Sequence, residues 1–105
     1  MNSPRRERAL LVQPAAPGKR DPAIAEEFAD LARSAGAEVI AVIDARLERP
    51  SASHYLGSGK VEELKGYCEA ADVDVVLVNA TLSPVQERNL SDDLGLGGVF
   101  LGGLG

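Results

Sequence analysis

A glycine-rich turn next to a lysine is the part of this sequence that most resembles a binding site. Residues 55–64 read YLGSGKVEEL, in which Gly57, Ser58, Gly59 and Lys60 stand where a helical pattern begins. Free backbone N–H groups at a helix N-terminus attract anions, and a lysine adds positive charge. The stretch therefore predicts either a phosphate-binding turn or a plain glycine turn that leads into a helix.

Neither standard phosphate-binding motif is complete in this stretch. A P-loop needs G-x-x-x-x-G-K-[ST], but Gly57 and Gly59 are too close together, and Val61 stands where Ser or Thr would hold Mg²⁺. The dinucleotide pattern G-x-G-x-x-G fails at Glu62. We also expect Glu62 and Glu63 to lie in the first helical turn, where their charge already complements the positive helix end. A glycine turn is the simpler interpretation, with phosphate or RNA-backbone contact as the alternative.

The loop before this turn carries other residue types that suit RNA. Arginine grips phosphates, and tyrosine stacks on an unpaired base. Together with the lysine, the RNA-contacting candidates are Arg46, Arg49, His54, Tyr55 and Lys60. The loop follows the carboxyl end of a predicted strand, where open α/β sheets usually carry function. The sequence shows no partner for His54, so taken alone it is expected to be a surface histidine rather than a ligand or a base.

Composition limits the possible functions. The 105 residues carry a formal net charge of −5, so any contact with nucleic acid must come from a local basic patch. One cysteine, Cys68, excludes an internal disulfide, and one cysteine with one histidine cannot build a zinc site, so we predict no metal site. No general acid–base pair stands out, and we name no catalytic residue. The apolar runs are far too short to cross a membrane and no secretory signal is present, which favours a cytoplasmic protein without a membrane partner.

Predicted strands and helices alternate along the chain. Apolar runs indicate strands at residues 9–13, 37–45 and 74–79, the first stopped by Pro14 and the second covered on both faces. A helical segment follows each strand. This order predicts an α/β fold, a small three-layer domain with a parallel sheet of three to four strands and about three helices. By analogy with flavodoxin-like sheets, we expect the strand order 2-1-3-4.

The predicted helices have recognisable ends and apolar faces. Asp21 is the expected N-cap of the first helix, and Gly36 its left-handed closing residue. The third helix begins with a capping box formed by Ser83 and Gln86, and ends at Gly95. Apolar residues at helical spacing predict buried faces, which are Ile24, Phe28, Leu31 and Ala35 in the first helix and Val61, Leu64, Cys68 and Ala71 in the second.

We expect the α/β domain to span residues 1–94 and a glycine-rich, truncated or altered end to span 95–105. That end reads GLGGVFLGGLG and is more than half glycine. Its VFL segment suits a fourth strand, although a weak one, because glycine adds an entropy cost and no side-chain packing.

Three ordered segments resemble the N-terminal domain of the HflX family of ribosome-associated GTPases. They are ERALLV (7–12), an R-P-x-x-x-x-Y-x-G-x-G-K-V-x-E-L segment (49–64) and an L-S-P-x-Q-x-R-N-L segment (82–90). The resemblance covers about residues 7–94. The residues that match the last two segments are Arg49, Pro50, Tyr55, Gly57, Gly59, Lys60, Glu63 and Leu64, and then Leu82, Ser83, Pro84, Gln86, Arg88, Asn89 and Leu90.

The resemblance implies a partner, the large ribosomal subunit with its ribosomal RNA. In the full-length family a helical hairpin and a GTP-binding domain with a P-loop and Mg²⁺ follow this domain. The present sequence departs from the family after Leu94, and these 105 residues contain no P-loop. We therefore expect no GTP or Mg²⁺ cofactor in this chain, and what carries over is the RNA-facing role of residues 46–60.

Two alternatives stay open from the sequence. The GSGK helix start could bind ATP or GTP itself, as some members of the family are credited with ATP binding through this domain. The chain could also be an inert gene fragment that folds poorly. The sequence does not determine an oligomeric state.

Overall fold

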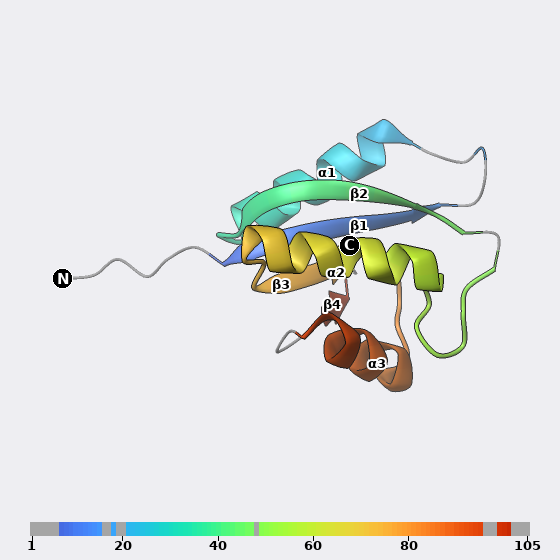
Figure 1. Ribbon diagram of the computed structural model, residues 1–105. Coiled ribbons are helices and arrows are strands. Elements are labelled where there is room, and N and C mark those ends of the chain that lie inside the picture. The colour runs from blue at the N-terminus through green and yellow to red at the C-terminus, as the bar shows by residue number, and fades with distance from the viewer. Residues whose placement is uncertain (1–6, 16–17, 19–20, 48, 96–98, 102–105) are drawn as a thin grey trace.

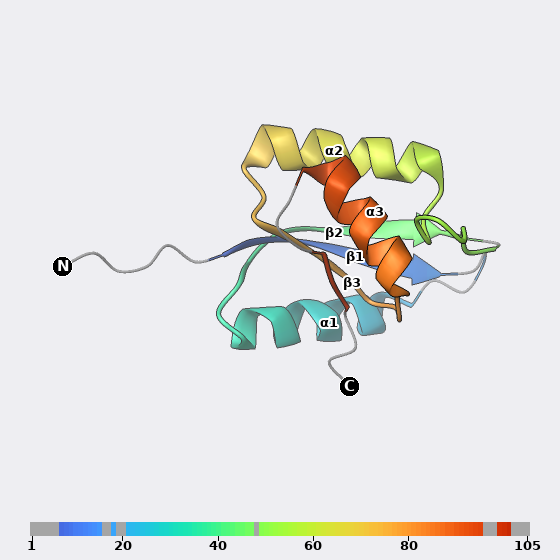
Figure 2. The ribbon, with the colours of Figure 1, turned by 90° about the horizontal axis from the view of Figure 1, so that it is seen from below.

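The computed structural model describes residues 7–15, 18, 21–47, 49–95 and 99–101, the last three in backbone only (Figure 1). Four strands form one parallel sheet in the order β2-β1-β3-β4, which confirms the predicted α/β class and strand order. Figure 2 shows α1 on one face of the sheet and α2 and α3 on the other, so the domain has three layers. The elements are β1 (Arg8–Ala15), α1 (Pro22–Ser34), β2 (Glu38–Arg46), α2 (Ser58–Ala71), β3 (Val75–Val78), α3 (Pro84–Leu94) and β4 (Val99–Leu101).

The central strand β1 supplies both hydrophobic cores. Its residues from Ala9 to Val12 are 0% exposed. Because side chains alternate along a strand, Ala9 and Leu11 pack with α1, whereas Leu10 and Val12 pack with α2 and α3. Two packed cores, one on each face of the sheet, speak against a fragment that folds poorly.

The prediction that Pro14 stops the first strand is wrong, because β1 continues to Ala15. Hydrogen bonds along β1 alternate between its two neighbours. The Val12 carbonyl accepts from Asn79 N just beyond β3, and the Ala15 carbonyl accepts from Leu47 N just beyond β2. This alternation turns Pro14 toward the β3 side, where pairing has already ended, so its missing N–H breaks no ladder bond.

The prediction that the second strand is covered on both faces is also wrong. β2 is an edge strand whose only described neighbour in the sheet is β1, and Val42 is 36% exposed. Ile43 and Ala45 are buried against α2 and α3, whereas Val39 and Ile40 are only partly buried. An apolar run identifies a strand, but it does not determine whether the strand lies at the centre of the sheet.

The buried face of α1 differs from the prediction. Phe28 is buried as expected, but Ile24 and Leu31 are 46% and 42% exposed, and Ala35 is exposed as well. Ala29 and Ala32 take their places beneath the helix. Their small side chains fit against Ala9 and Leu11 of β1, so the helix rests on its alanines rather than on its larger aliphatic residues.

The predicted helix ends are confirmed. Asp21 Oδ1 accepts from Ala23 N at 3.0 Å and caps α1. In the capping box of α3, Ser83 Oγ accepts from Gln86 N at 3.2 Å, while Gln86 Oε1 accepts from Ser83 N at 2.8 Å. Gly36 and Gly95 follow their helices with φ of 94° and 69°, a region that favours glycine. None of the helices in the described part of the chain has both the length and the apolar character of a membrane span.

The packing of α3 gives a first prediction. Leu90 is 0% exposed between α3 and the sheet, so we expect Leu90→Ala to lower the free energy of unfolding by about 2–5 kcal/mol, as measured by urea denaturation. Val85 on the same helix is 59% exposed, and Val85→Ala should change it by less than about 0.5 kcal/mol. Equal losses in the two variants would contradict this packing.

Candidate functional site

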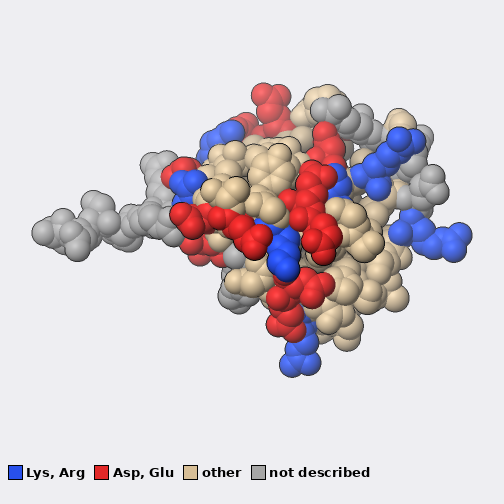
Figure 3. Space-filling model, in the orientation of Figure 1, with Lys and Arg blue, Asp and Glu red and all other residues tan. Residues whose placement is uncertain are grey.

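The candidate site lies where β2 runs into α2, at the carboxyl edge of the parallel sheet (Figure 1). Figure 3 shows basic side chains gathered at this end of the molecule and acidic side chains lying across α2. All the residues proposed for RNA contact belong to this segment, from Arg46 at the end of β2 to Lys60 in the first turn of α2. The fold therefore places the predicted residues on one continuous stretch at one edge.

The loop between the two elements contains a compact hydrogen-bonded turn. Ser51 and Tyr55 exchange two backbone hydrogen bonds, each 2.9 Å long. Tyr55 adopts a positive φ of 67°, which is uncommon for a residue with a large side chain. Its side chain also packs partly against the main core. Residues 51–55 of the predicted loop thus form an ordered turn, and part of the Tyr55 ring is buried against the protein core.

Helix α3 holds this turn through three polar side chains. Gln86 Nε2 donates to Ser51 O at 2.8 Å, and Asn89 Nδ2 donates to Ser53 O at 2.8 Å. The third contact is a 2.6 Å hydrogen bond between Asp93 Oδ2 and the ring of His54. Residues spaced by three and four lie on one face of a helix. We call the three α3 side chains, Gln86, Asn89 and Asp93, the α3 latch.

His54 therefore has partners, which corrects the expectation of an isolated surface histidine. Because a carboxylate only accepts hydrogen bonds, Nε2 carries the hydrogen that is donated to Asp93. The other ring nitrogen, Nδ1, lies 2.8 Å from Ser53 Oγ. The imidazole is thus fixed on both sides.

Sequence reasoning missed the contacts of the latch with the loop. A signal was present, because Gln86 and Asn89 belong to the L-S-P-x-Q-x-R-N-L segment and share a helical face with Asp93. The spacing does not say what that face contacts, since the loop lies more than 30 residues earlier in the chain.

The second helix begins early enough that Glu62 and Glu63 lie beyond its first turn, and this changes the electrostatics of the GSGK stretch. Helix α2 starts at Ser58 after Gly57, which provides no side-chain cap, so Gly59 and Lys60 lie inside the first turn. The expectation that Glu62 and Glu63 occupy the first turn is wrong, because that turn contains no acidic residue. The positive helix end is thus not compensated in the expected way. Instead Glu63 Oε1 pairs with Lys60 Nζ at 3.1 Å.

A pocket of about 360 Å³ adjoins the helix start, but its lining does not suit a phosphate. Gly57 and Ser58 line it with His54, whereas Gly59 and Lys60 do not. None of the described lining residues is Lys or Arg, and two are the carboxylates Glu62 and Asp93. The other lining residues are Ser51, Ser53, Leu56 and Val61. Carboxylates repel phosphate oxygens, so this geometry does not favour nucleotide binding by the GSGK stretch.

The two arginines are the predicted cations that stay available to a partner. Arg46 and Arg49 are exposed, and neither forms an ion pair with a residue in the described part of the chain. Lys60 is engaged by Glu63, and its side chain is 25% exposed. Within the candidate set, positive charge directed to solvent therefore resides chiefly in the arginines.

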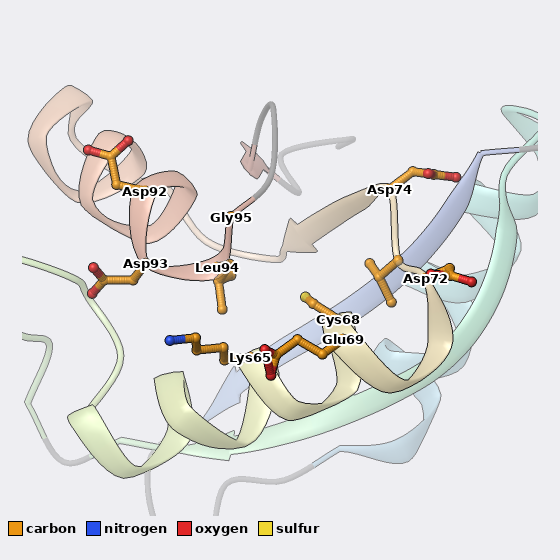
Figure 4. A pocket seen from close by; sticks show the side chains of 10 residues that line it. Lys65, Cys68, Glu69, Asp72, Asp74, Asp92, Asp93, Leu94 and Gly95 are labelled. Carbon is orange, nitrogen blue, oxygen red and sulfur yellow. The ribbon is translucent and has the colours of Figure 1, made fainter.

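A larger cleft of about 740 Å³ lies between the C-terminal parts of α2 and α3 (Figure 4). Its charged lining is mainly acidic, and Lys65 is the one basic residue among the described residues that line it. Burial, with a smaller contribution from the charge of Glu69, raises the pKa of the Cys68 thiol on its wall. Nowhere in the described ranges do three His, Cys, Asp or Glu side chains come together as metal ligands. The acidic lining residues are Glu69, Asp72, Asp74, Asp92 and Asp93.

A comparison with protein families and a comparison with curated proteins both match this chain to the same group of GTPases. Residues 23–97 match the family described as GTP-binding GTPase N-terminal. The GTPase HflX of Caldanaerobacter subterraneus subsp. tengcongensis is 40% identical over 91 residues, which cover 87% of this chain and 21% of the relative. The Magnetococcus marinus GTPase HflX is 38% identical over 84% of this chain and 21% of the relative. The Escherichia coli GTPase HflX is 37% identical over 80% of this chain and 20% of the relative, so the chain spans about a fifth of these curated relatives.

The buried thiol gives a second prediction. The raised pKa of Cys68 means that the folded state holds this proton more tightly than the unfolded state. Its stabilising effect is complete below the pKa of an unfolded thiol, about 8.5, and is lost as the pH rises through the higher pKa of the folded thiol. Wild type should thus lose more free energy of unfolding than Cys68→Ala between about pH 7 and about pH 10, in urea titrations. Equal losses would contradict an ionisation linked to burial.

Proposed function

Because the chain belongs to the HflX family of GTPases and matches its N-terminal domain, we propose that it contacts the large ribosomal subunit and binds ribosomal RNA through residues 46–60. The observation that carries this proposal is the pair of exposed arginines, Arg46 and Arg49, which have no ion pair among the described residues. Ribosomal RNA is the partner whose phosphates such arginines would grip.

Local charge supports RNA contact even though the whole chain is acidic. A net charge of −5 disfavours general binding to polyanions, so binding must be confined to one end of the molecule. Figure 3 shows basic side chains at that end. One nearby carboxylate, that of Glu63, is paired with the Lys60 ammonium group within the protein. This pairing lowers the repulsion that Glu63 would exert on an approaching phosphate.

The five proposed contact residues have unequal parts in this proposal. Arg46 and Arg49 bind backbone phosphates directly. Tyr55 offers the exposed part of its ring to an unpaired base, which is the usual way in which RNA-binding proteins read single strands. His54 and Lys60 contribute less, because each already has a partner inside the protein.

We assign no catalytic residue or cofactor to these 105 residues. The relatives are named as GTPases, and the 105-residue sequence contains no P-loop, so GTP and Mg²⁺ in this family would be held by residues outside it. A ribosome-contacting role would place the protein in the cytoplasm.

The proposal predicts that Arg46→Ala and Arg49→Ala each weaken binding to purified large ribosomal subunits by roughly 10- to 100-fold, since a charged hydrogen bond is worth about 1.5–3 kcal/mol. Co-sedimentation over a range of salt concentrations measures this. The slope of log affinity against log salt should become shallower by about one unit for each arginine–phosphate pair that the substitution removes.

The matched control is Arg33→Ala. Arg33 lies on α1, on the opposite face of the sheet, and pairs with Asp30 at 3.0 Å. The Arg33→Ala variant should bind large ribosomal subunits like wild type, with an unchanged salt slope. Wild-type affinity in the arginine variants of the loop would contradict the proposed RNA contact.

The acidic lining of the pocket predicts weak nucleotide binding. Titration with labelled ATP and GTP should give affinities no tighter than about millimolar, a free energy near −4 kcal/mol. Lys60→Ala should leave them unchanged, because Lys60 does not line the pocket. Micromolar binding that is lost in Lys60→Ala would instead support a nucleotide site at the GSGK stretch.

A further inference from the structure

We propose that the α3 latch positions the RNA-contacting loop without touching RNA, so that Gln86, Asn89 and Asp93 set the affinity of residues that lie more than 30 positions earlier in the chain. This inference rests on the proposed function. It assigns a role to the polar face of α3.

The α3 latch forms hydrogen bonds with three residues of the turn. It contacts the backbone carbonyl of Ser51, the carbonyl of Ser53 and the ring of His54, at 2.8, 2.8 and 2.6 Å. The two amide groups bind backbone rather than side chains. They therefore fix the path of the chain whatever side chains it carries.

The helix that carries the latch is itself fixed. Leu90 and Leu94 are buried against the sheet, on a different side of α3 from the latch. Gln86 also belongs to the capping box, since its Oε1 accepts from Ser83 N while its Nε2 donates to Ser51. The start of α3 and the turn are thus joined through one side chain.

Fixing Ser51 also constrains Arg49, because only Pro50 lies between them and its ring fixes φ. Ordering a flexible residue costs about 1–2 kcal/mol of free energy, and a loop that is ordered before binding avoids this loss when RNA arrives. The latch therefore increases affinity by preorganisation. The exposed arginine supplies the contact itself.

The charge of Asp93 makes this role distinguishable from direct contact. A carboxylate near RNA repels phosphate, so removing it without other effects should strengthen binding. If Asp93 acts by holding His54, its removal should weaken binding instead. Asp92 precedes it on α3 and forms no hydrogen bond or ion pair with the described residues of the turn, so Asp92→Ala removes the same charge and leaves the latch intact.

The experiment compares Asn89→Ala and Asp93→Ala with Asp92→Ala. Hydrogen exchange in the free protein should be faster across residues 51–56 in the two latch variants, by roughly 2–10-fold for one lost hydrogen bond, and unchanged in Asp92→Ala. Affinity for purified large subunits should fall by a similar factor in the latch variants, with the wild-type salt slope, because both arginines still reach their phosphates. Urea denaturation checks that each variant is folded.

The two readouts separate the possible failures. Unchanged exchange across residues 51–56 in both latch variants would overturn the latch, whatever the ribosome data show. Faster exchange with unchanged affinity, or a salt slope that falls as it does in Arg49→Ala, would overturn the positioning role. Absence of binding by the wild type would refute the proposed function and the RNA role of the latch, while exchange would still test the hold of α3 on the turn.

Discussion

The burial of β1 is the constraint on which the rest of the molecule depends. From Ala9 to Val12 the strand is buried, and its side chains pack alternately into the two hydrophobic cores on opposite faces of the sheet. Helices must then cover both faces, and each strand must be connected to the next by a crossover that returns it to the same direction. The carboxyl ends of the strands consequently meet at one edge. The basic loop lies at that edge because it follows the carboxyl end of β2.

Helix α3 connects the core to that edge. Its motif, L-S-P-x-Q-x-R-N-L, can be read residue by residue: Leu90 is buried in the core, Ser83 and Gln86 form the cap, and Asn89 binds the turn. One helix thus anchors itself in the core with one face and orders a loop with another. Fold stability and loop order are therefore coupled, and a change that displaces α3 also alters the turn.

Local signals in the sequence were sufficient to predict the helices and strands, but not the residues that each of them contacts. The caps at Asp21 and Ser83 depend on residues within one turn, and they were predicted correctly. Helical spacing in α1 allows two adjacent faces to be buried, one that contains Ile24 and one that contains Ala29 and Ala32. The sheet beneath the helix determines that the alanine face is the buried one. The contact of His54 with Asp93 spans 39 positions, and no local pattern encodes it. The site residues could be named from the sequence, but their partners could not.

The N-terminus of α2 and the side chains around it have opposite effects on the binding of a phosphate. With Ser58 as its first residue, the helix turns bare N–H groups toward the loop, an arrangement that by itself favours a phosphate. Its surroundings oppose this, because Glu62 and Asp93 line the adjoining pocket and Lys60 is held by Glu63. A phosphate that entered the pocket would meet carboxylates, whereas one that stayed outside could meet Arg46 and Arg49. The acidic lining thus makes this end a poor nucleotide pocket, whereas the proposed contact with an extended chain of phosphates would use Arg46 and Arg49 outside the pocket.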